Sequence, residues 1–527
     1  MSDDLSAKSA AKTCRQPELV LTILHFNDVY ELDARTEDPV GGATRFATAL
    51  QEFQSLNPLL VFSGDCLSPS LLSTVTKGRH MVDILNKLGV HCAVYGNHEF
   101  DFGVDHLEEM TAEMTFPWFL SNIYDKFTSL PLGHGKVKRI LLWNGMKIGI
   151  MGLVEEDWFE LLGTIDKDNI LYVDYVEAAN QLSTELREQG ADLVVALTHM
   201  RWRNDIRLAS EAKGLNLILG GHDHEYGVLE VNGILIVKSG KVAKDQDGSF
   251  HFGCHKITIH KDLKEDADIK QIVDKYNNNV QHMFMEVLCH TEVDLDGRYA
   301  TVRNRECNLG NLITNAMLEA TNAEVAILNS GTLRSDRIHP AGPLTMHDLM
   351  QILPIMDLVL VVEATGQQLY EGLENSVKNY PALDGRFLQV AGIEFGFDPN
   401  GKPGHRVIVE TVMVQGKSLD MNRIYLVAMK EYLTKGKDGY SMFTGCRQRV
   451  GIESGQVLST ILINHFESFQ IVKGLKTSKS SHRMGLIKVS RSPSLTCENS
   501  LHAPVGVAMV PGVEGRIFHI PNEKPLP

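Results

Sequence analysis

The chain has 527 residues and a formal net charge of −15 at pH 7. Hydrophobic residues make up 43% of it and charged residues 22%, which is typical of a soluble globular protein with room for two or three domains. A nucleic-acid-binding surface needs clustered Lys and Arg, so this acidic balance argues against a nucleic-acid partner, although it does not exclude a small phosphate ligand.

The sequence shows no targeting or membrane signal. Residues 1–16 are polar and lack the apolar core of a secretory signal. No stretch is long and uncharged enough to span a bilayer, and the C-terminal end has no apolar segment of the GPI type. The eight Cys residues show no disulfide spacing. We therefore expect a cytoplasmic protein with no membrane partner, and the sequence leaves its oligomeric state unknown.

Predicted strands and helices alternate through the first half of the chain. Strands are expected at 18–27, 59–63, 91–95, 116–122, 191–198 and 215–219. Helices are expected at 41–56, 80–88, 104–114 and 176–189, and hairpins at 139–154 and 229–237. This alternation indicates a layered α/β core. A charged, helical stretch follows at 263–290.

The second half has its own set of predicted elements. Helices are expected at 308–321, 367–378 and 456–469, and strands at 324–329, 358–363 and 424–429. The domain plan is therefore a flexible N-terminal tail at 1–18, a first domain at 19–262, a linker helix at 263–290, a second domain at 291–474 and a mobile tail, rich in Ser, Pro and Gly, at 475–527.

The most informative stretch is Tyr95-Gly-Asn-His-Glu-Phe-Asp-Phe-Gly103. It follows a short apolar strand, so Asn97 and His98 would lie at the carboxyl end of that strand, where open α/β sheets place their ligands. Taken alone, the stretch is equally consistent with an ordinary strand-to-helix turn in which Asp101 caps the helix.

Other predicted strands end in residues of the same kind. Each has a mundane explanation by itself, such as a cap, a turn or a core His. Together, carboxylates, imidazoles and an amide oxygen at five strand ends indicate a site for Mn, Zn, Fe or Mg. The residues concerned are Asp28, Tyr30, Asp65, Asn97, His98, His199, His222 and His224.

The chemistry of a pair of cations explains this set. Two divalent ions about 3.5–4 Å apart need a bridging carboxylate, for which Asp65 is the candidate, and they turn a bound water into a nucleophile. The residual positive charge would hold a phosphoryl group. His98 is placed to donate a hydrogen bond to that group or to its leaving oxygen, and Asp101 could fix the ring of His98.

These blocks resemble the calcineurin-like metallophosphoesterases, and most closely their 5'-nucleotidase branch. The resemblance covers residues 19–474 and rests on the ordered set Asp28-Val-Tyr30, Gly64-Asp65, Gly96-Asn-His-Glu99, Thr198-His-Met200 and Gly221-His-Asp-His224. It implies a four-layer α/β/β/α metallophosphoesterase domain followed by an α+β substrate-binding domain of the 5'-nucleotidase C-terminal type.

The resemblance also implies roles for individual residues. It assigns one metal to Asp28, Asp65 and His224, and the other to Asp65, Asn97, His199 and His222. His98 and Asp101 match the family's catalytic pair. The two divalent ions are Zn, Mn, Mg or Fe, and the residues do not choose between them.

One position departs from the family pattern, which has His where this chain has Tyr30. A phenol has a pKa of about 10 and is a poor ligand to a divalent ion. A water could fill the gap, Tyr30 could bind as a phenolate to a strong Lewis acid such as ferric iron, or Tyr30 could pack or hydrogen-bond nearby; we favour the first or the third.

The second domain carries the expected substrate residues. Arg303, Asn329 and Arg334 match positions around the bound nucleotide in the resembled family, and Arg suits oxyanions. Phe387 and Tyr440 match two rings that sandwich the base there, and such stacking is worth about 1–3 kcal/mol per ring. Without the resemblance, surface ion pairs and a core Phe would explain these residues as well.

The sequence supports a metal-dependent phosphohydrolase that cleaves nucleoside 5'-monophosphates to nucleoside and phosphate. The expected partner is therefore a nucleotide or another small phosphate ester. One alternative is a phosphodiesterase or pyrophosphatase that acts on UDP-sugars or cyclic nucleotides. Another is a non-catalytic nucleotide-binding relative, for which Tyr30 is the main argument.

Overall fold

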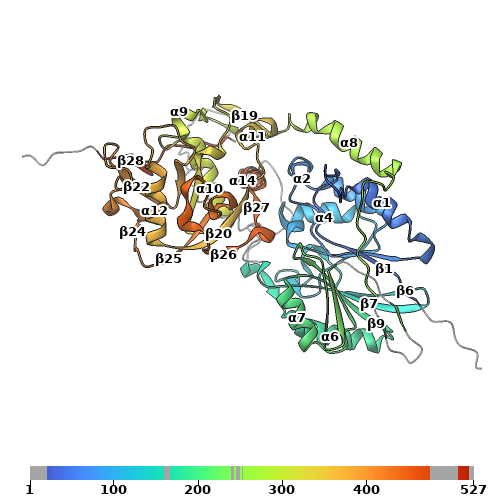
Figure 1. Ribbon diagram of the computed structural model, residues 1–527. Helices are drawn as coiled ribbons and strands as arrows, with labels where there is room; N and C mark the ends of the chain where they lie inside the picture. Colours follow the sequence, from blue (N-terminus) through green and yellow to red (C-terminus); the bar gives the residue numbers. More distant parts are fainter. Residues whose placement is uncertain are drawn as a thin grey trace, which may run out of the picture.

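The computed structural model describes residues 20–158, 167–238, 243–244, 250–251, 253–474 and 508–520. The predicted tail at 1–18 lies outside these residues, as do 475–507 and 521–527 of the predicted C-terminal tail. The described residues form two domains joined by α8 (Ala267–Met283), which extends along the first domain toward the second (Figure 1).

The first domain contains two sheets. One has four parallel strands in chain order, and the other has six strands in the order β11-β12-β10-β9-β7-β6, with antiparallel hairpin strands at both edges. The strands are β1 (Ile23–Phe26), β2 (Leu59–Phe62), β3 (Cys92–Val94), β4 (Trp118–Phe119), β6 (Lys138–Trp143), β7 (Met146–Val154), β9 (Leu193–Met200), β10 (Leu217–His222), β11 (Gly227–Val231) and β12 (Ile234–Lys238).

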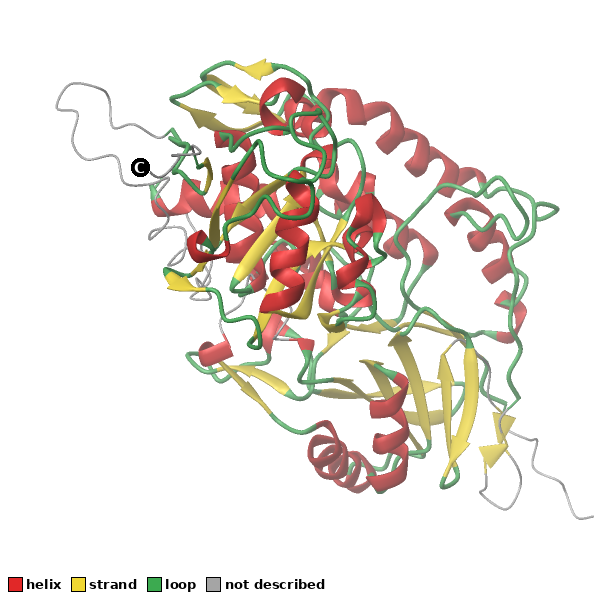
Figure 2. Cartoon of the chain, turned by 60° about the vertical axis from the view of Figure 1, so that its left-hand side comes forward, coloured by secondary structure: helices red, strands yellow, loops and turns green. Residues whose placement is uncertain are grey.

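These two sheets pack face to face between two layers of helices. A single buried cluster joins residues of β1–β4 to residues of β7, β9 and β10, and a second cluster joins the outer face of the larger sheet to its helices. Every residue of β2 and β9 is buried, as expected for strands covered on both faces. The four-layer α/β/β/α prediction is confirmed (Figures 1 and 2). The helices are α1 (Ala43–Gln51), α3 (Arg79–Leu88) and α4 (Val104–Ala112) on one side, and α6 (Tyr175–Glu188) and α7 (Trp202–Glu211) on the other.

The second domain is built on a mainly antiparallel sheet in the order β21-β17-β25-β20-β26, which confirms the α+β prediction. The residues 456–457, predicted as the start of a helix, instead pair with β20 as a short strand, and the helix begins after them. The elements are α10 (Asn308–Thr321), β17 (Val325–Asn329), β20 (Leu358–Thr365), α12 (Gly366–Val377), β21 (Leu388–Ala391), β25 (Ile424–Lys430), β26 (Arg447–Val450), β27 (Gln456–Val457) and α14 (Leu458–Val472).

Residues 508–520 belong to the second domain, contrary to the mobile tail expected there. Their strand β28 (Ile517–His519) pairs in parallel with β22 (Ile393–Phe397). The buried carboxylate of Glu306 accepts hydrogen bonds from the backbone N–H groups of Glu514 at 2.7 Å and Arg516 at 2.6 Å. The composition predicted mobility because a strand this short shows little sequence periodicity. The carboxylate of Glu306 nevertheless holds this segment in place by accepting hydrogen bonds from its backbone.

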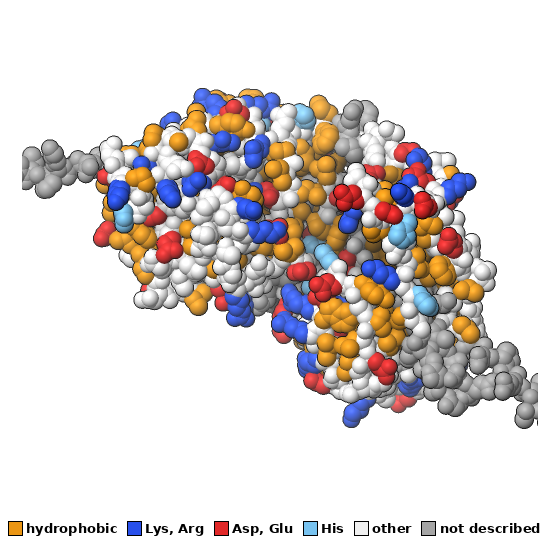
Figure 3. Space-filling model, viewed as in Figure 1, with side chains coloured by type: hydrophobic (Ala, Val, Ile, Leu, Met, Phe, Trp, Pro, Cys, Tyr) orange, Lys and Arg blue, Asp and Glu red, His pale blue; other side chains and the backbone are white. Residues whose placement is uncertain are grey.

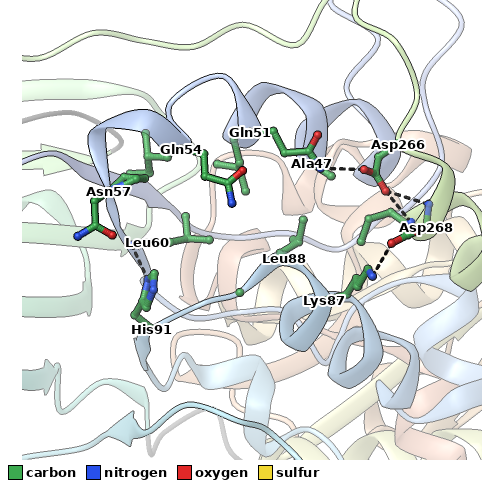
Figure 4. Close-up of a pocket in the computed structure, with 15 residues that line it drawn as sticks. Ala47, Gln51, Gln54, Asn57, Leu60, Lys87, Leu88, His91, Asp266 and Asp268 are labelled. Atoms are coloured by element: carbon green, nitrogen blue, oxygen red, sulfur yellow. Dashed lines mark hydrogen bonds and ion pairs between the residues drawn. The ribbon is translucent and has the colours of Figure 1, made fainter.

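A cavity of about 430 Å³ lies between α1, the amino ends of β1–β3 and the start of α8 (Figure 4). Lys87 reaches Asp268 beside it, and Gln51 donates to Asp266. None of the predicted site residues lines this cavity. It lies at the opposite end of the strands from those residues, so it does not form part of the candidate site.

Candidate metal centre

The predicted ligand residues arrive from the carboxyl ends of five strands. Asp28 and Asp65 follow β1 and β2, and Asn97 opens the short 3-10 helix η2 (Asn97–Phe100) after β3. His199 lies near the end of β9, and the last residue of β10 is His222. Parallel register brings these ends level, because β9 and β10 pair up to Gly221 with His199 and His222 with Met200.

The backbone is strained where it delivers these side chains. Asp28, Asp65 and His222 have φ angles of 53°, 66° and 79°, in the left-handed region that non-glycine residues rarely adopt. Each such residue costs about 1–3 kcal/mol and persists only where its surroundings impose it. Gly96 lets the turn after β3 come close to Asp65, since a Cβ at this position would lie 2.0 Å from Oδ1 of Asp65.

One part of the centre joins Asp65, His199 and His222, whose ligand atoms all lie within 4.8 Å of one another. Nε2 of His199 is 3.1 Å from Oδ2 of Asp65 and 3.3 Å from Nδ1 of His222. The other nitrogen of His199 donates to the carbonyl of Ser63 at 2.7 Å, which leaves the Nε2 lone pair facing the cluster.

Asn97 is the remaining residue predicted for the same metal. Its Oδ1 is buried and has no hydrogen-bond partner among the residues that the structure describes. A buried amide oxygen without a donor is costly, and a cation would satisfy it. The donor set of two imidazoles, a carboxylate and this oxygen therefore suits a divalent metal.

A second part of the centre groups Asp28, Tyr30 and His224 with Asp65. The hydroxyl of Tyr30 is 3.1 Å from Oδ1 of Asp28, 3.2 Å from Oδ2 of Asp65 and 3.1 Å from Nε2 of His224. Nε2 of His224 lies 3.6 Å from Oδ1 of Asp28, and its side chain is 46% exposed. Tyr30 therefore lies among the predicted ligands of the first metal.

The carboxylates of the centre favour positive charge between them. Burial alone would lower the pKa of His199, but the nearby Asp65 outweighs it and raises the pKa to about 9. Burial would likewise raise the pKa of Asp28, yet the neighbouring His224 and His199 lower it below its usual range. The pKa of His222 is lowered by burial and by His199, which suits a neutral ligand. A bound cation would supply the positive charge that these carboxylates favour.

His98 and Asp101 form a buried pair beside the centre. Nδ1 of His98 is 2.8 Å from Oδ2 of Asp101, and both side chains are 2% exposed. Burial would lower the pKa of His98, but Asp101 and Asp65 outweigh it and raise the pKa to about 10. Nε2 of His98 donates to the carbonyl of Glu453 in the second domain at 3.1 Å. Both partners are acceptors, so both ring nitrogens carry protons in this arrangement.

Sequence reasoning missed several residues that support the centre. The buried carboxylate of Glu99 accepts from the N–H groups of Asp65 at 2.8 Å, Cys66 at 2.7 Å and Gly96 at 2.6 Å, so it ties two strand ends together. Its place beside His98 in the motif was the available signal. The ammonium of Lys238 donates to backbone carbonyls at the ends of β9 and β10. Its position in a hairpin strand gave no signal of this role in the sequence.

The substrate residues expected in the second domain occupy two groups. Arg303 stacks on Tyr299, with its guanidinium carbon 3.8 Å from the ring centre, and the hydroxyl of Tyr299 donates to the carbonyl of Arg334 at 3.3 Å. Asn329 is 3% exposed and donates to Asp438 at 2.9 Å.

Phe387 and Tyr440 differ from the prediction. Their rings are 2% and 0% exposed and belong to the hydrophobic core of this domain. Tyr440 lies parallel to Phe443 at 6.1 Å, and its hydroxyl donates to the carbonyl of Arg386 at 2.6 Å. In this arrangement neither ring has a free face for a base, because tertiary packing has placed both inside.

Two family models match the chain. Residues 21–226 match the calcineurin-like phosphoesterase family, and residues 287–445 match the 5'-nucleotidase, C-terminal domain. These matches coincide with the two domains and together cover more than half of the chain. The chain belongs to the 5'-nucleotidase family of calcineurin-like phosphoesterases. It is accordingly a hydrolase that acts on phosphoric ester bonds.

Individual relatives agree with this assignment. The chain is 27% identical to the 5'-nucleotidase of Mus musculus over 535 residues, which cover 88% of this chain and 92% of the relative. It is 29% identical over 482 residues to the trifunctional nucleotide phosphoesterase protein YfkN of Bacillus subtilis. This match covers 80% of this chain but only 32% of the length of YfkN.

Solved structures share the fold of this 5'-nucleotidase-family chain. The NAD nucleotidase of Haemophilus influenzae has a TM-score of 0.70 at 19% identity and covers 85% of this chain and 96% of its own. Members of the phosphoesterase family use divalent metals, and the cluster around Asp65 is the candidate site here. Among the described helices, none has the length and apolar character that a bilayer span requires.

Proposed function

We propose that the chain hydrolyses nucleoside 5'-monophosphates to nucleoside and phosphate at the centre around Asp65. The observation that carries this proposal is the buried cluster of Asp65, His199 and His222, delivered by three strand ends, with the buried His98–Asp101 pair joined to it through the backbone N–H of His98. The family assignment supports phosphoester hydrolysis, and the nucleotide substrate follows from the relatives' activity.

The proposed ligand sets divide the centre in two. Asp28, Asp65 and His224 would hold one cation, and Asp65, Asn97, His199 and His222 the other. Bound divalent ions would supply Lewis-acid stabilisation of the phosphoryl group and a water of lowered pKa. Asp65 belongs to both sets because its Oδ2 faces Nε2 of His199 and the hydroxyl of Tyr30.

Among the protein's own residues, His98 would act as the general acid. Its backbone N–H donates to Oδ1 of Asp65 at 2.9 Å, so the ring is fixed next to the proposed bridge. Nδ1 would stay bonded to Asp101, and Nε2 would exchange the carbonyl of Glu453 for a phosphoryl or leaving-group oxygen. The acid role fits a ring that carries protons on both nitrogens.

The second domain would hold the nucleoside. Arg303, Asn329 and Arg334 remain the proposed contacts, and the guanidinium groups suit oxyanions and ribose hydroxyls. Figure 3 shows the surface hollowed where the two domains meet, with histidine and apolar side chains exposed there. Phe387 and Tyr440 would stack on a base only after leaving the positions described above.

The test is phosphate release from a panel of phosphate esters after reconstitution with defined amounts of Mn or Zn. We expect the highest kcat/KM for nucleoside 5'-monophosphates. Removal of a positioned general acid typically costs about 10²–10⁴-fold, so His98→Ala should lose activity by that order at unchanged metal content. Equal release by both proteins would remove the catalytic assignment.

A cytoplasmic location is also proposed. In the described part of the chain, free thiols are found at Cys66, Cys92, Cys289, Cys307 and Cys446, and the first four are buried. Free thiols are typical of a reducing compartment. Microscopy of a fluorescent fusion would test this, and a signal confined to the cell surface would contradict it.

A further inference from the structure

A short segment of the second domain contacts both members of the His98–Asp101 pair. This segment, residues 453–456, leads from β26 into α14 and includes the first residue of β27. The carbonyl of Glu453 accepts from Nε2 of His98 at 3.1 Å. Nε2 of Gln456 donates to Oδ1 of Asp101 at 2.9 Å. The pair is therefore completed by a domain that does not carry the metal ligands.

Asp101 depends on this contact for its orientation. Its carboxylate is buried, and one oxygen, Oδ2, already binds His98. The other oxygen, Oδ1, receives the amide of Gln456, so both oxygens are satisfied and the plane of the carboxylate is set. Without that donor the carboxylate would keep a buried oxygen unpaired, or rotate toward another donor and away from His98.

Gln456 is itself held rigidly. It is 6% exposed and pairs with Val359 of β20, an interior strand of its sheet. Eight residues along, Asn464 of α14 donates to the backbone carbonyl of Asp101. An ion pair of 2.7 Å between Lys77 and Glu467 extends the same contact. Two amide side chains from one continuous stretch thus hold Asp101 by its side chain and by its backbone.

The chemistry of an amide suits this position. A Lys or Arg beside Asp101 would compete with His98 for the carboxylate charge and weaken their bond. An uncharged donor sets the carboxylate plane and leaves its charge directed at the ring. The same reasoning applies to neutral groups that orient metal ligands by hydrogen-bonding to them on the side away from the metal.

We propose that Gln456 is a positioning residue, supplied across the domain boundary, which orients Asp101 and through it His98. The inference rests on the proposed function for its catalytic consequence, although the contact itself does not. It follows that the acid pair is fully ordered only while the two domains are docked as described here.

The experiment compares Gln456→Leu with Gln367→Leu, a matched change at an exposed glutamine of α12 whose side chain donates to Glu371 in its own helix. Both are measured with the full-length protein at equal metal content, using AMP as the substrate. We expect Gln456→Leu to lower kcat about 10- to 100-fold, as loss of an orienting partner does. KM should stay within about twofold, the split expected when only the transition state loses an interaction.

A double-mutant cycle shows whether Gln456 acts through Asp101. In an Asp101→Asn background, Gln456→Leu should cause no further loss of kcat. An equal loss in both backgrounds, or an unchanged kcat in the single variant, would overturn the proposal. Should Gln456→Leu fail to fold, Gln456→Asn, which keeps a shorter amide, is measured in its place.

A spectroscopic measurement separates this inference from the proposed function. The buried Nδ1–H of His98 should give a downfield proton resonance, which is assigned by its absence in His98→Ala. We expect Gln456→Leu to shift or broaden it, and Gln367→Leu to leave it in place. An unmoved resonance would refute positioning even in an active enzyme. A shifted one would support it even if wild-type protein released no phosphate from AMP, which would refute only the proposed function.

Discussion

Tyr30 illustrates how one side chain can change a metal site. Ligands about 2.1 Å from a shared cation lie roughly 3.0–3.4 Å from one another. The three distances from the Tyr30 hydroxyl, 3.1, 3.2 and 3.1 Å, are compatible with that spacing as well as with hydrogen bonds. Burial and the charges of Asp65 and Asp28 raise the pKa of Tyr30 well above its ordinary value, which favours the neutral phenol here.

We expect Tyr30→His to tighten metal binding at the subsite of Asp28 and His224. An imidazole is a better ligand than a neutral phenol, and the gain should be on the order of tenfold. Competition titration with a chromophoric chelator measures it for Mn and Zn. Tyr30→Phe, which keeps the ring and removes the hydroxyl, is the matched control, and equal affinities for all three proteins would contradict the expectation.

Lys238 is a second residue through which one charged group, its ammonium, contributes to the structure of the site. It is 1% exposed, and its ammonium donates to the carbonyls of Met200 at 2.7 Å and Gly221 at 2.8 Å, each adjacent to a predicted metal ligand. It also lies 3.3 Å from the buried carboxylate of Asp205 and 2.5 Å from the carboxylate of Asp223. One cation thus holds two strand ends together and compensates a buried charge.

Lys238→Met should lower the free energy of unfolding by about 3–5 kcal/mol, the usual cost of leaving one partner of a buried ion pair alone. Urea denaturation followed by circular dichroism measures this. Adding Asp205→Asn should restore part of the loss, because the fully buried one of the two carboxylates that Lys238 compensates is then neutral. A double variant no more stable than Lys238→Met would show that the carbonyl contacts, and not the charge, matter.

At the scale of elements, the site depends on how closely the turns after β2 and β3 approach each other. Glu99 joins them by accepting N–H bonds from both turns. Gly96 is required for the approach and not for its backbone angle, since its φ is an ordinary −97°. The space available beside Asp65 is therefore what a side chain at this position would remove.

Gly96→Ala should displace Asp65 and weaken metal binding by about tenfold or more, because the new Cβ would start 2.0 Å from Oδ1 of Asp65. Metal content after dialysis against a chelator gives the comparison. Gly253→Ala is the control, since a Cβ there meets nothing within 4 Å and no positive φ stands in its way. Equal retention of metal by both variants would show that the turn adapts.

At the scale of the molecule, the second domain is closed by residues far along the chain. Residues 508–520 run back across it, and the guanidinium of Arg516 donates to the carbonyl of Val390 at 2.7 Å. Glu306 lies beneath this segment, 4% exposed, and depends on its N–H groups. The segment therefore stabilises the domain that would carry the substrate.

Truncation after residue 507 should lower the stability of the second domain. The carboxylate of Glu306 would lose its backbone donors, and one unsatisfied buried group costs about 1–3 kcal/mol or more when it is charged. Differential scanning calorimetry should show a lower transition temperature. Truncation after residue 520 retains all the described contacts and serves as the control, and identical transitions in the two proteins would contradict this role.

The sequence by itself determined the order of elements, the two-domain plan and the candidate ligand set, because these depend on local patterns. Apolar runs of strand length, turn residues after them and helical periodicity are all readable within a few residues. Asp28, Asp65, Asn97, His199 and His222 could be selected because parallel strands place their carboxyl ends at one edge.

Only the tertiary structure decided which distant groups meet. Gln456 and Asp101 are 355 residues apart, and no local pattern marks an amide for contact with a carboxylate in another domain. The burial of Phe387 and Tyr440, the anchoring of residues 508–520 and the place of Tyr30 among three ligands were decided in the same way. Each depends on packing between segments far apart in the chain, whereas sequence periodicity reports only which face of its own element a residue occupies.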